Sequence, residues 1–361
     1  MRSHISAEDE GAGGEGGEKY AEIRDKFRKA AGRTILPIFV VRDGGGWRPV
    51  VYEMDIAPHI AWDEVDLKPV KTLKLSVYEE KDLEHVVTRS EDAREVIRQK
   101  SVVQLKEGGI HVDPVFMTRQ ICDIVPNPWR AHEFANSILE HYRDRKKSDE
   151  RLIANNFVFL IEELRKQVEK EKERLAESIF RAMLEKDELR FLVIGKDFDW
   201  TFPKKIAVRP KYLNRKDGSQ LELSLFEAVS EDEFNETEKA VAWYLESQER
   251  LFFWFRNRSR RDYSIQGWRE HRIYPDFIFT ATERDEKKDY ERVYVVETKG
   301  LHIKDSEKTN YIRKVFDICT KQAESRNWTE LGLQMKDKAL QFEVLDESEW
   351  QAKLNEILQE A

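Results

Sequence analysis

The sequence predicts an α/β protein, and three observations favour this class. Segments with apolar residues at helical spacing alternate with short runs rich in β-branched and aromatic residues. The 361 residues are 40% hydrophobic and 11% aromatic, which is enough to build more than one core, while 37% are charged, as is typical of solvated helix faces. One strand-like run, VYVVETKGLH at residues 293–302, ends in an acid and a lysine two positions apart.

The N-terminal part predicts a tail followed by a mixed region. Residues 1–18 are acidic and rich in glycine and have no apolar segment, so we expect a flexible tail. Residues 19–120 form a mixed region of unknown role. Within it, residues 34–57 have the pattern of two strands around a turn at Gly44–Gly46.

A helical region is expected at residues 121–188. Residues 127–147 have helical spacing, and residues 148–188 predict a long helix that Ser148 caps. Its apolar stripe is interrupted at Glu171. A surface helix or an antiparallel coiled-coil arm explains this pattern, and a partner-binding helix is the alternative.

The last region, residues 189–361, begins with strand-like runs at 189–194, 204–210 and 221–226. Its core, residues 235–346, predicts the order helix, three strands, helix, strand. The six segments are 235–248, 250–258, 271–281, 292–300, 306–326 and 339–346. A final helix is expected at residues 348–359.

Two neighbouring strands of this core carry polar residues. Asp276 interrupts the apolar run IYPDFIF, and Glu297 and Lys299 end the next strand on one face because strand side chains alternate. If the two strands pair as a hairpin, Asp276 approaches Glu297. Two half-buried carboxylates repel each other, and a divalent cation removes that conflict. Oxygen ligands without cysteine favour Mg²⁺ or Mn²⁺.

Composition excludes several classes of protein. Cys122 and Cys319 are the only cysteines, which excludes a disulfide framework and a cysteine-based zinc site and favours the cytoplasm. No apolar run is long enough for a membrane span. The net charge of −8 argues against indiscriminate nucleic-acid binding by the whole chain, although a local basic surface remains compatible with it.

The pair Pro275–Asp276, followed by Glu297-Thr298-Lys299 within this order of elements, resembles the PD-(D/E)xK nuclease superfamily. A narrower resemblance covers WFRNRSRRDYSIQGWREHRIYPDFIF and VYVVETKG. These stretches are similar to the C-terminal nuclease domain of the helicase-nuclease (Res) subunit of type III restriction enzymes and related helicases. The segment VPNPWRAHEFA resembles a part of the same proteins upstream of that domain.

The resemblance implies a restriction-endonuclease-like fold and roles for individual residues. Asp276 and Glu297 match the metal-binding acids, and the backbone carbonyl of Thr298 matches a third ligand. Lys299 matches the lysine that positions or polarises the attacking water. Many members add an acid from the first helix, for which Glu238 is the candidate. Its position three residues after Asn235 also fits a capping arrangement, with Glu236 as the other candidate acid.

Basic residues near these acids are candidates for phosphate contact. They are Arg256, Arg258, Arg260, Arg261, Lys308 and Lys314. The alternative for the arginine run is a solvated loop that neutralises the acidic residues around it. Tyr263 and Trp268 are expected either to stack on bases or to pack in the protein.

The expected function is therefore that of a Mg²⁺-dependent (or Mn²⁺-dependent) endonuclease that hydrolyses DNA, within a type III-like restriction or antiviral defence system. Members of the family with this domain contain an ATP-driven helicase motor, but the sequence has no phosphate-binding loop. We expect the motor on a separate subunit or on a missing part of a larger protein, and a homodimer for double-strand cleavage. The alternative is a non-catalytic nucleic-acid-binding or assembly subunit that recruits a separate helicase.

Overall fold

The fold is described from a computed structural model, in which the following residues are placed: 19–76, 103–106, 109–145, 148–194, 200–282, 289–300, 306–324 and 339–359. The expected tail at residues 1–18 lies outside the described residues. The general α/β class predicted from the sequence is confirmed, because helices alternate with several β-sheets along the chain.

The chain folds as two compact units. Unit 1 combines the residues up to Val50 with those from Glu188 onward, and unit 2 is the segment Val51–Asp187 between them. The boundary that the sequence suggested after residue 188 lies within one residue of the point where unit 1 resumes, whereas residue 120 lies inside unit 2 and the residues up to Val50 belong to unit 1. The reason is a long-range pairing: β3 (Ile38–Asp43) lies between β4 (Gly46–Pro49) and β7 (Leu189–Leu192), antiparallel to both. Local sequence patterns carry no information about such a pairing.

The central sheet of unit 1 has four strands in the order in which they occur in the chain. They are β10 (Leu251–Arg256), β11 (Phe277–Ala281), β12 (Arg292–Lys299) and β13 (Ala339–Asp346). The first two pairs are antiparallel, and β12 pairs with β13 in parallel along all eight residues. A parallel pair needs a crossover connection, and α11 (Glu307–Glu324) lies within it.

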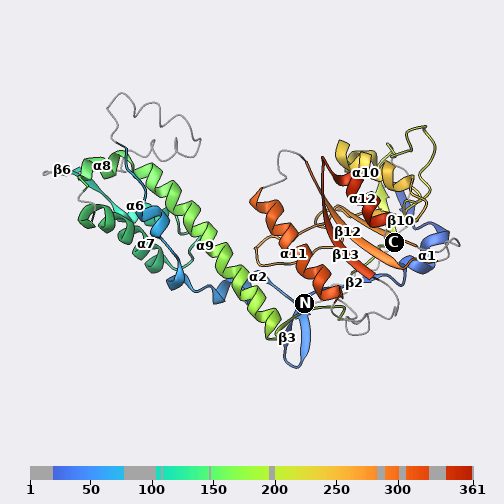
Figure 1. Cartoon of the computed structure of the whole chain (residues 1–361), viewed down its shortest axis with the longest axis horizontal. Helices are drawn as coiled ribbons and strands as arrows, with labels where there is room; N and C mark the ends of the chain where they lie inside the picture. Colours follow the sequence, from blue (N-terminus) through green and yellow to red (C-terminus); the bar gives the residue numbers. More distant parts are fainter. Residues whose placement is uncertain are drawn as a thin grey trace, which may run out of the picture. The chain divides into compact units, whose positions relative to one another are not determined.

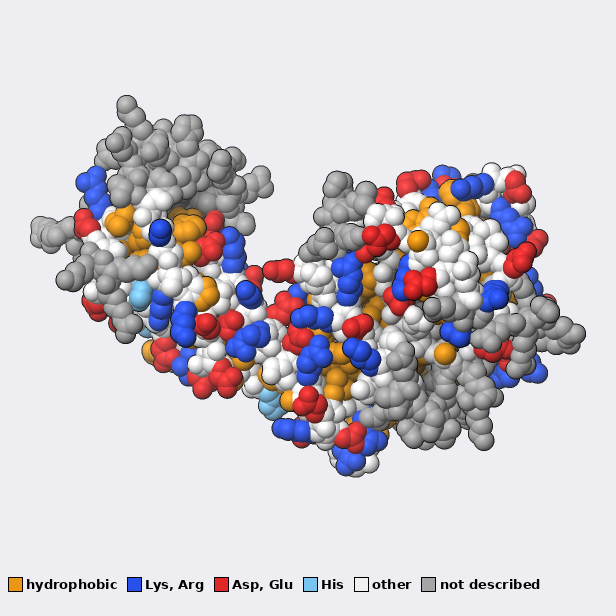
Figure 2. Space-filling model, viewed as in Figure 1, with side chains coloured by type: hydrophobic (Ala, Val, Ile, Leu, Met, Phe, Trp, Pro, Cys, Tyr) orange, Lys and Arg blue, Asp and Glu red, His pale blue; other side chains and the backbone are white. Residues whose placement is uncertain are grey.

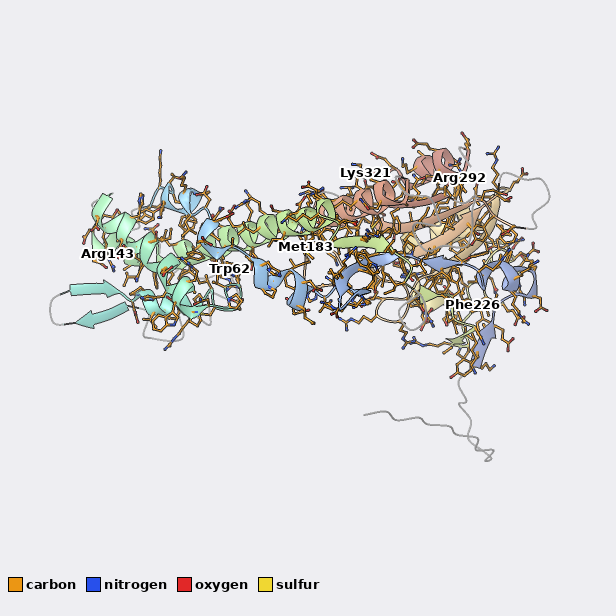
Figure 3. The ribbon with its side chains drawn as sticks, turned by 90° about the horizontal axis from the view of Figure 1, so that it is seen from below. Trp62, Arg143, Met183, Phe226, Arg292 and Lys321 are labelled. Carbon is orange, nitrogen blue, oxygen red and sulfur yellow. The ribbon has the colours of Figure 1, made fainter. Side chains whose placement is uncertain are left out.

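Helices cover both faces of this sheet (Figure 1). On one face, Phe316 of α11 packs on Phe342 of β13, with ring centroids 5.5 Å apart. On the other face, the Tyr294 hydroxyl donates to the carbonyl of Ile357 in α12 (Trp350–Gln359) at 3.2 Å. Helix α10 (Glu236–Glu246) precedes the sheet, so the expected order helix, three strands, helix, strand is present. In Figure 3, Lys321 marks α11 and Arg292 marks the start of β12.

Smaller elements complete unit 1. Helix α1 (Asp25–Ala31) packs Phe27 on Phe252 and Phe253 of the central sheet. The remaining pairs are β1 (Lys19–Glu22) with β9 (Lys205–Val208) and β2 (Ile35–Leu36) with β8 (Trp200–Thr201), and a 3₁₀ turn, η4, spans Glu231–Glu233. The strand expected at residues 221–226 is wrong. Ser224 and Phe226 form only isolated bridges, with Trp254 and Ile23, and the segment lies along β10 as a loop that bonds to the Trp254 backbone.

Unit 2 is mainly helical, with one hairpin of β5 (Val103–Lys106) and β6 (Gly109–Val112). Its helices are α2 (Tyr52–Asp55), α3 (Lys68–Lys71), α6 (Pro114–Arg119), α7 (Pro128–Glu140), α8 (Glu150–Asn155) and α9 (Phe157–Glu185). Short turns are η1 (Ala57–His59), η2 (Trp62–Glu64) and a π-helical turn, η3 (His141–Arg145).

The long helix predicted at residues 148–188 is two helices, and Asp149 rather than Ser148 caps the first. Asn156 separates them because its side-chain amide donates to the carbonyls of Ser76 and Leu152 at 2.9 and 2.8 Å. The apolar side of α9, from Phe157 to Val168, packs in the core of unit 2 together with α6 and α7. This part of α9 is thus a core helix and not a solvated arm. None of the helices that the structure describes has an apolar stretch sufficient to cross a bilayer.

Candidate active site

Asp276 and Glu297 meet at one end of the central sheet. Strands β11 and β12 form the expected antiparallel hairpin, in which Phe277 pairs with Val296. The Asp276 backbone N–H donates to the Val296 carbonyl at 2.8 Å, so continuing the register by one residue places Asp276 opposite Glu297. The prediction that Asp276 approaches Glu297 across a hairpin is therefore confirmed.

The carboxylate of Asp276 is held from two sides. Its Oδ2 accepts from the backbone N–H and the hydroxyl of Thr298, each at 2.7 Å. Its Oδ1 accepts from Nη1 of Arg256 at 3.2 Å. These contacts fix the orientation of the carboxylate at the end of the sheet.

Glu297 and Lys299 lie side by side, each with only 9% of its side chain exposed. The Lys299 ammonium donates to Glu297 Oε1. Glu297 Oε2 is buried and has no hydrogen-bond partner among the residues that the structure describes. Such an orphaned buried oxygen costs about 1–3 kcal/mol and is rare in a folded protein.

A second buried carboxylate of unit 1 provides a comparison. Both oxygens of Glu246 are occupied, because Oε2 accepts from the Trp254 indole at 2.8 Å and Oε1 accepts from the Leu223 backbone at 2.6 Å. Glu246 therefore has a purely structural environment. In Glu297, by contrast, only one of the two oxygens has a partner among the described residues.

The pKa of Glu297 is raised to about 8, mainly by burial and also by the nearby Asp276 carboxylate. The ammonium of Lys299 opposes both effects but does not cancel them. Near neutral pH, the positive charge around Glu297 is therefore too small to keep its buried carboxyl group ionised.

Glu238 contributes to the site and also caps its own helix. Its backbone N–H donates to Asn235 Oδ1, and its Oε2 accepts from the Asn235 backbone N–H, both at 2.9 Å. Its Oε1 accepts from Nη2 of Arg256 at 2.7 Å. Burial raises the pKa of Glu238, while Arg256 lowers it. The capping arrangement is confirmed, and Glu236 instead pairs with Lys239 at the surface.

Arg256 is turned into the acidic cluster, with 13% of its side chain exposed. Its guanidinium lies over the rings of Phe234 and Phe277, at 5.7 and 5.4 Å from their centroids. Nη1 also donates to the backbone carbonyls of Asp276 and Asn257 at 2.8 and 3.0 Å. The sequence suggested a phosphate contact for Arg256, whereas its side chain here bonds to protein acids.

The other predicted basic residues lie outside the acidic cluster. Arg258 is paired with Asp262 at 2.8 Å, and Arg260 and Arg261 are exposed in the following loop. Lys308 and Lys314 are exposed on α11, and the charge of Lys308 acts on Glu297 from there by lowering its pKa. On the face drawn in Figure 2, acidic and basic side chains are interspersed.

Tyr263 and Trp268 are packing residues. Both side chains are fully buried, and the Tyr263 hydroxyl donates to the Pro37 carbonyl at 2.6 Å. Of the two roles expected for these side chains, stacking on bases or packing, the structure shows packing, because neither ring is accessible.

The acidic residues and Lys299 line a hollow of about 460 Å³ at the end of the sheet. Its lining residues are Asn235, Glu236, Thr237, Glu238, Asp276, Glu297, Thr298, Lys299 and Gly300. Among the residues that the structure describes, no group of three or more His, Cys, Asp or Glu side chains is arranged to hold a metal ion. The side chains of the site offer instead a pair of acids, Asp276 and Glu297, of which only Glu297 has a free oxygen.

The fit of this pair to a divalent cation follows from its donor chemistry. Carboxylate oxygens are the ligands that Mg²⁺ and Mn²⁺ prefer, and the unpartnered Oε2 of Glu297 lacks a positive partner. The role of Arg256 in the cluster was missed from the sequence. The signal in the sequence was an arginine at the end of an otherwise apolar strand, LFFWFR. Such an arginine can lie at the surface or can be a buried counter-ion, and the strand pattern does not distinguish these two positions.

No family model, no curated protein and no solved structure matches this chain. The resemblance to PD-(D/E)xK nucleases therefore stays a prediction that rests on the residues themselves.

Proposed function

We propose that this protein is a metal-dependent nuclease that hydrolyses phosphodiester bonds of DNA at the end of the central sheet. The observation that carries the proposal is the unpartnered, buried Oε2 of Glu297 beside Asp276 and Lys299. A carboxylate without a partner in this position is unfavourable for stability alone, and strained or unsatisfied groups cluster at functional sites. As further proposals, the protein acts in type III-like restriction or defence, together with an ATP-dependent helicase.

The residues that would hold the cation are Asp276, Glu297 and the backbone carbonyl of Thr298. When bound, a divalent cation supplies a Lewis acid that polarises a phosphoryl oxygen and lowers the pKa of a water. Thr298 keeps the Asp276 carboxylate in place through two hydrogen bonds. Lys299 gives up its bond to Glu297 and donates instead to the attacking water or to the negative charge that develops on the phosphate.

Plasmid cleavage by the whole chain tests this proposal. With Mg²⁺ or Mn²⁺ we expect nicking that falls at least about 100-fold in Asp276→Ala and Lys299→Ala, because positioned acid–base and electrostatic groups typically contribute that much. Asp317→Ala and Lys321→Ala are the matched controls. These two residues form a pair on α11 whose side chains are 74% and 73% exposed, and both variants should cut like the native chain.

Nicking that survives in Asp276→Ala and Lys299→Ala would place the activity elsewhere. If no sample cuts, the assay is repeated with a helicase subunit supplied. A chain that then still neither cuts nor binds Mn²⁺ contradicts the proposal.

A specific observation favours a second candidate, a non-catalytic nucleic-acid-binding or assembly module. Apart from Glu297 Oε2, each carboxylate oxygen of Glu238, Asp276 and Glu297 already has a partner within the protein. In this alternative, Arg256 and Lys299 replace the metal permanently. It predicts DNA binding that does not depend on divalent cations, which an electrophoretic mobility assay with and without EDTA distinguishes.

A further inference from the structure

The acidic cluster already contains a built-in cation. The guanidinium of Arg256 bridges Glu238 Oε1 at 2.7 Å and Asp276 Oδ1 at 3.2 Å. It is also bonded to two backbone carbonyls and lies over two aromatic rings. These contacts engage Nη1 and Nη2, while Nε is buried and has no partner among the described residues. A side chain held by four charge-assisted hydrogen bonds does not leave its position at low cost.

From this geometry we infer that Arg256 occupies, between Glu238 and Asp276, the place of a second divalent cation. The site then takes a single divalent cation, and Glu238 is not one of its ligands. This inference rests on the proposed function and decides how many cations that function uses.

The charges of the cluster support a single cation. A bound divalent cation favours the ionised form of Glu297. The carboxylates of Glu238, Asp276 and Glu297 then stand against Arg256 and Lys299, which leaves one formal negative charge. One divalent cation reverses this to one positive charge, which suits a phosphate. A second would leave three positive charges among side chains that are largely buried, where repulsion between like charges is strong.

The hydrogen bonds of the carboxylates also indicate a single divalent cation. Both oxygens of Glu238 are committed, one to the cap of α10 and the other to Arg256. Among the described residues, Glu297 Oε2 is the oxygen of the three carboxylates that has no partner, and the other oxygen of Glu297 accepts from Lys299 and not from Arg256. A cation entering the hollow is therefore drawn to Glu297 and Asp276, while Arg256 keeps Glu238 and the backbone of Asp276 in position.

Counting bound Mn²⁺ in the whole chain, by the electron paramagnetic resonance signal of free Mn²⁺, tests the inference without relying on activity. Binding that remains in an Asp276→Ala, Glu297→Gln double variant is subtracted as background. We expect one Mn²⁺ for the native chain, one for Arg256→Lys, and two for Arg256→Met, which keeps an apolar stem but removes the charge.

A second pair of variants keeps the test decisive if Arg256→Met does not fold. Glu238→Gln should bind Mn²⁺ within about threefold of the native affinity, whereas Glu297→Gln should bind at least about 100-fold more weakly, as expected for the loss of a direct ligand. Circular dichroism of each variant verifies that it is folded.

The possible results separate the two proposals. Equal Mn²⁺ numbers in the native chain and Arg256→Met, or a 100-fold loss in Glu238→Gln, overturn the inference about Arg256 and leave the nuclease proposal standing. A native chain that binds no more Mn²⁺ than the double variant overturns both.

Discussion

Glu297 shows how a single residue can be unfavourable for stability and useful for binding. Its carboxyl group is buried beside another acid, and one of its oxygens lacks a partner. Lys299 compensates only in part. The folded chain therefore holds a proton on Glu297 to a higher pH than the unfolded chain does.

This difference predicts how stability depends on pH when no divalent metal is present. The pKa of Glu297 rises from 4.5 to about 8 on folding, so between these values the folded state binds the proton that the unfolded state releases. Stability from this group is complete below pH 4.5 and is lost as the pH rises toward 8. Urea denaturation at pH 5 and pH 8 should show this loss in the native chain, by more than about 1 kcal/mol relative to Glu297→Gln.

Asp317→Asn provides the control for that measurement, because its carboxylate is largely exposed and should leave the pH dependence as in the native chain. If the free energy of unfolding of the native chain and of Glu297→Gln changed equally between pH 5 and pH 8, Glu297 would be ionised at no cost in the folded state. The raised pKa would then be wrong, and with it the view that the site is short of positive charge.

At the residue scale, the sequence predicts the meeting of Asp276, Glu297 and Lys299, because strand alternation and a hairpin suffice to bring them together. It does not predict the direction of Arg256. An arginine at a strand end can point to solvent or inward, and the choice depends on Phe234, Glu238 and Phe277, which come from three separate elements or loops.

At the scale of elements, α11 is fixed to the loop between β10 and β11 by a very close contact. A Cβ atom added to Gly267 would lie 2.5 Å from the Tyr311 hydroxyl and 2.8 Å from Val315 Cγ2. These distances leave no room for a side chain. Only glycine lets the loop reach the helix that carries Lys308 and Lys314.

Gly267→Ala should therefore destabilise the protein by about 1–3 kcal/mol, the usual cost of overpacking. Gly46→Ala is the matched control, since its Cβ would lie 3.7 Å from the Asp43 carbonyl, an ordinary contact. Thermal denaturation should give a clearly lower melting temperature for Gly267→Ala than for Gly46→Ala. Equal values would mean that α11 can shift away without cost.

Elements were predicted best where one local pattern decides them. The strand at residues 339–346 and the order of the core elements agree with the sequence. The prediction of one long helix is wrong at Asn156, because the side chain of this residue bonds to Ser76, which is distant in the sequence and close only in the folded unit 2. The strand expected at residues 221–226 failed for a similar reason, since its apolar residues pack as a loop.

At the scale of the whole molecule, unit 2 is inserted into unit 1. The chain leaves unit 1 after β4 and returns to it at β7, and both strands pair with β3. Because neighbouring strands are about 4.8 Å apart, the two ends of the insertion lie roughly 15 Å from each other when the offset along the strands is included.

Unit 1 should therefore fold without unit 2. Replacing residues 51–187 by a Gly-Ser linker of about eight residues spans the gap, since an extended residue covers about 3.4 Å. We expect a soluble protein with a cooperative melting transition and the same Mn²⁺ binding as the whole chain. An aggregated product, or one that has lost Mn²⁺ binding, would mean that unit 2 is needed to form the site.

The parallel pairing of β12 with β13 has a consequence for synthesis of the protein. All residues that line the hollow precede residue 301, but the strand that completes the sheet beside Lys299 comes only at residues 339–346. While the ribosome is still translating this last strand, one edge of β12 has no partner and the end of the sheet is not fixed. We therefore expect the end of β12 that carries Glu297 and Lys299 to become fixed in a nascent chain only when synthesis is nearly finished.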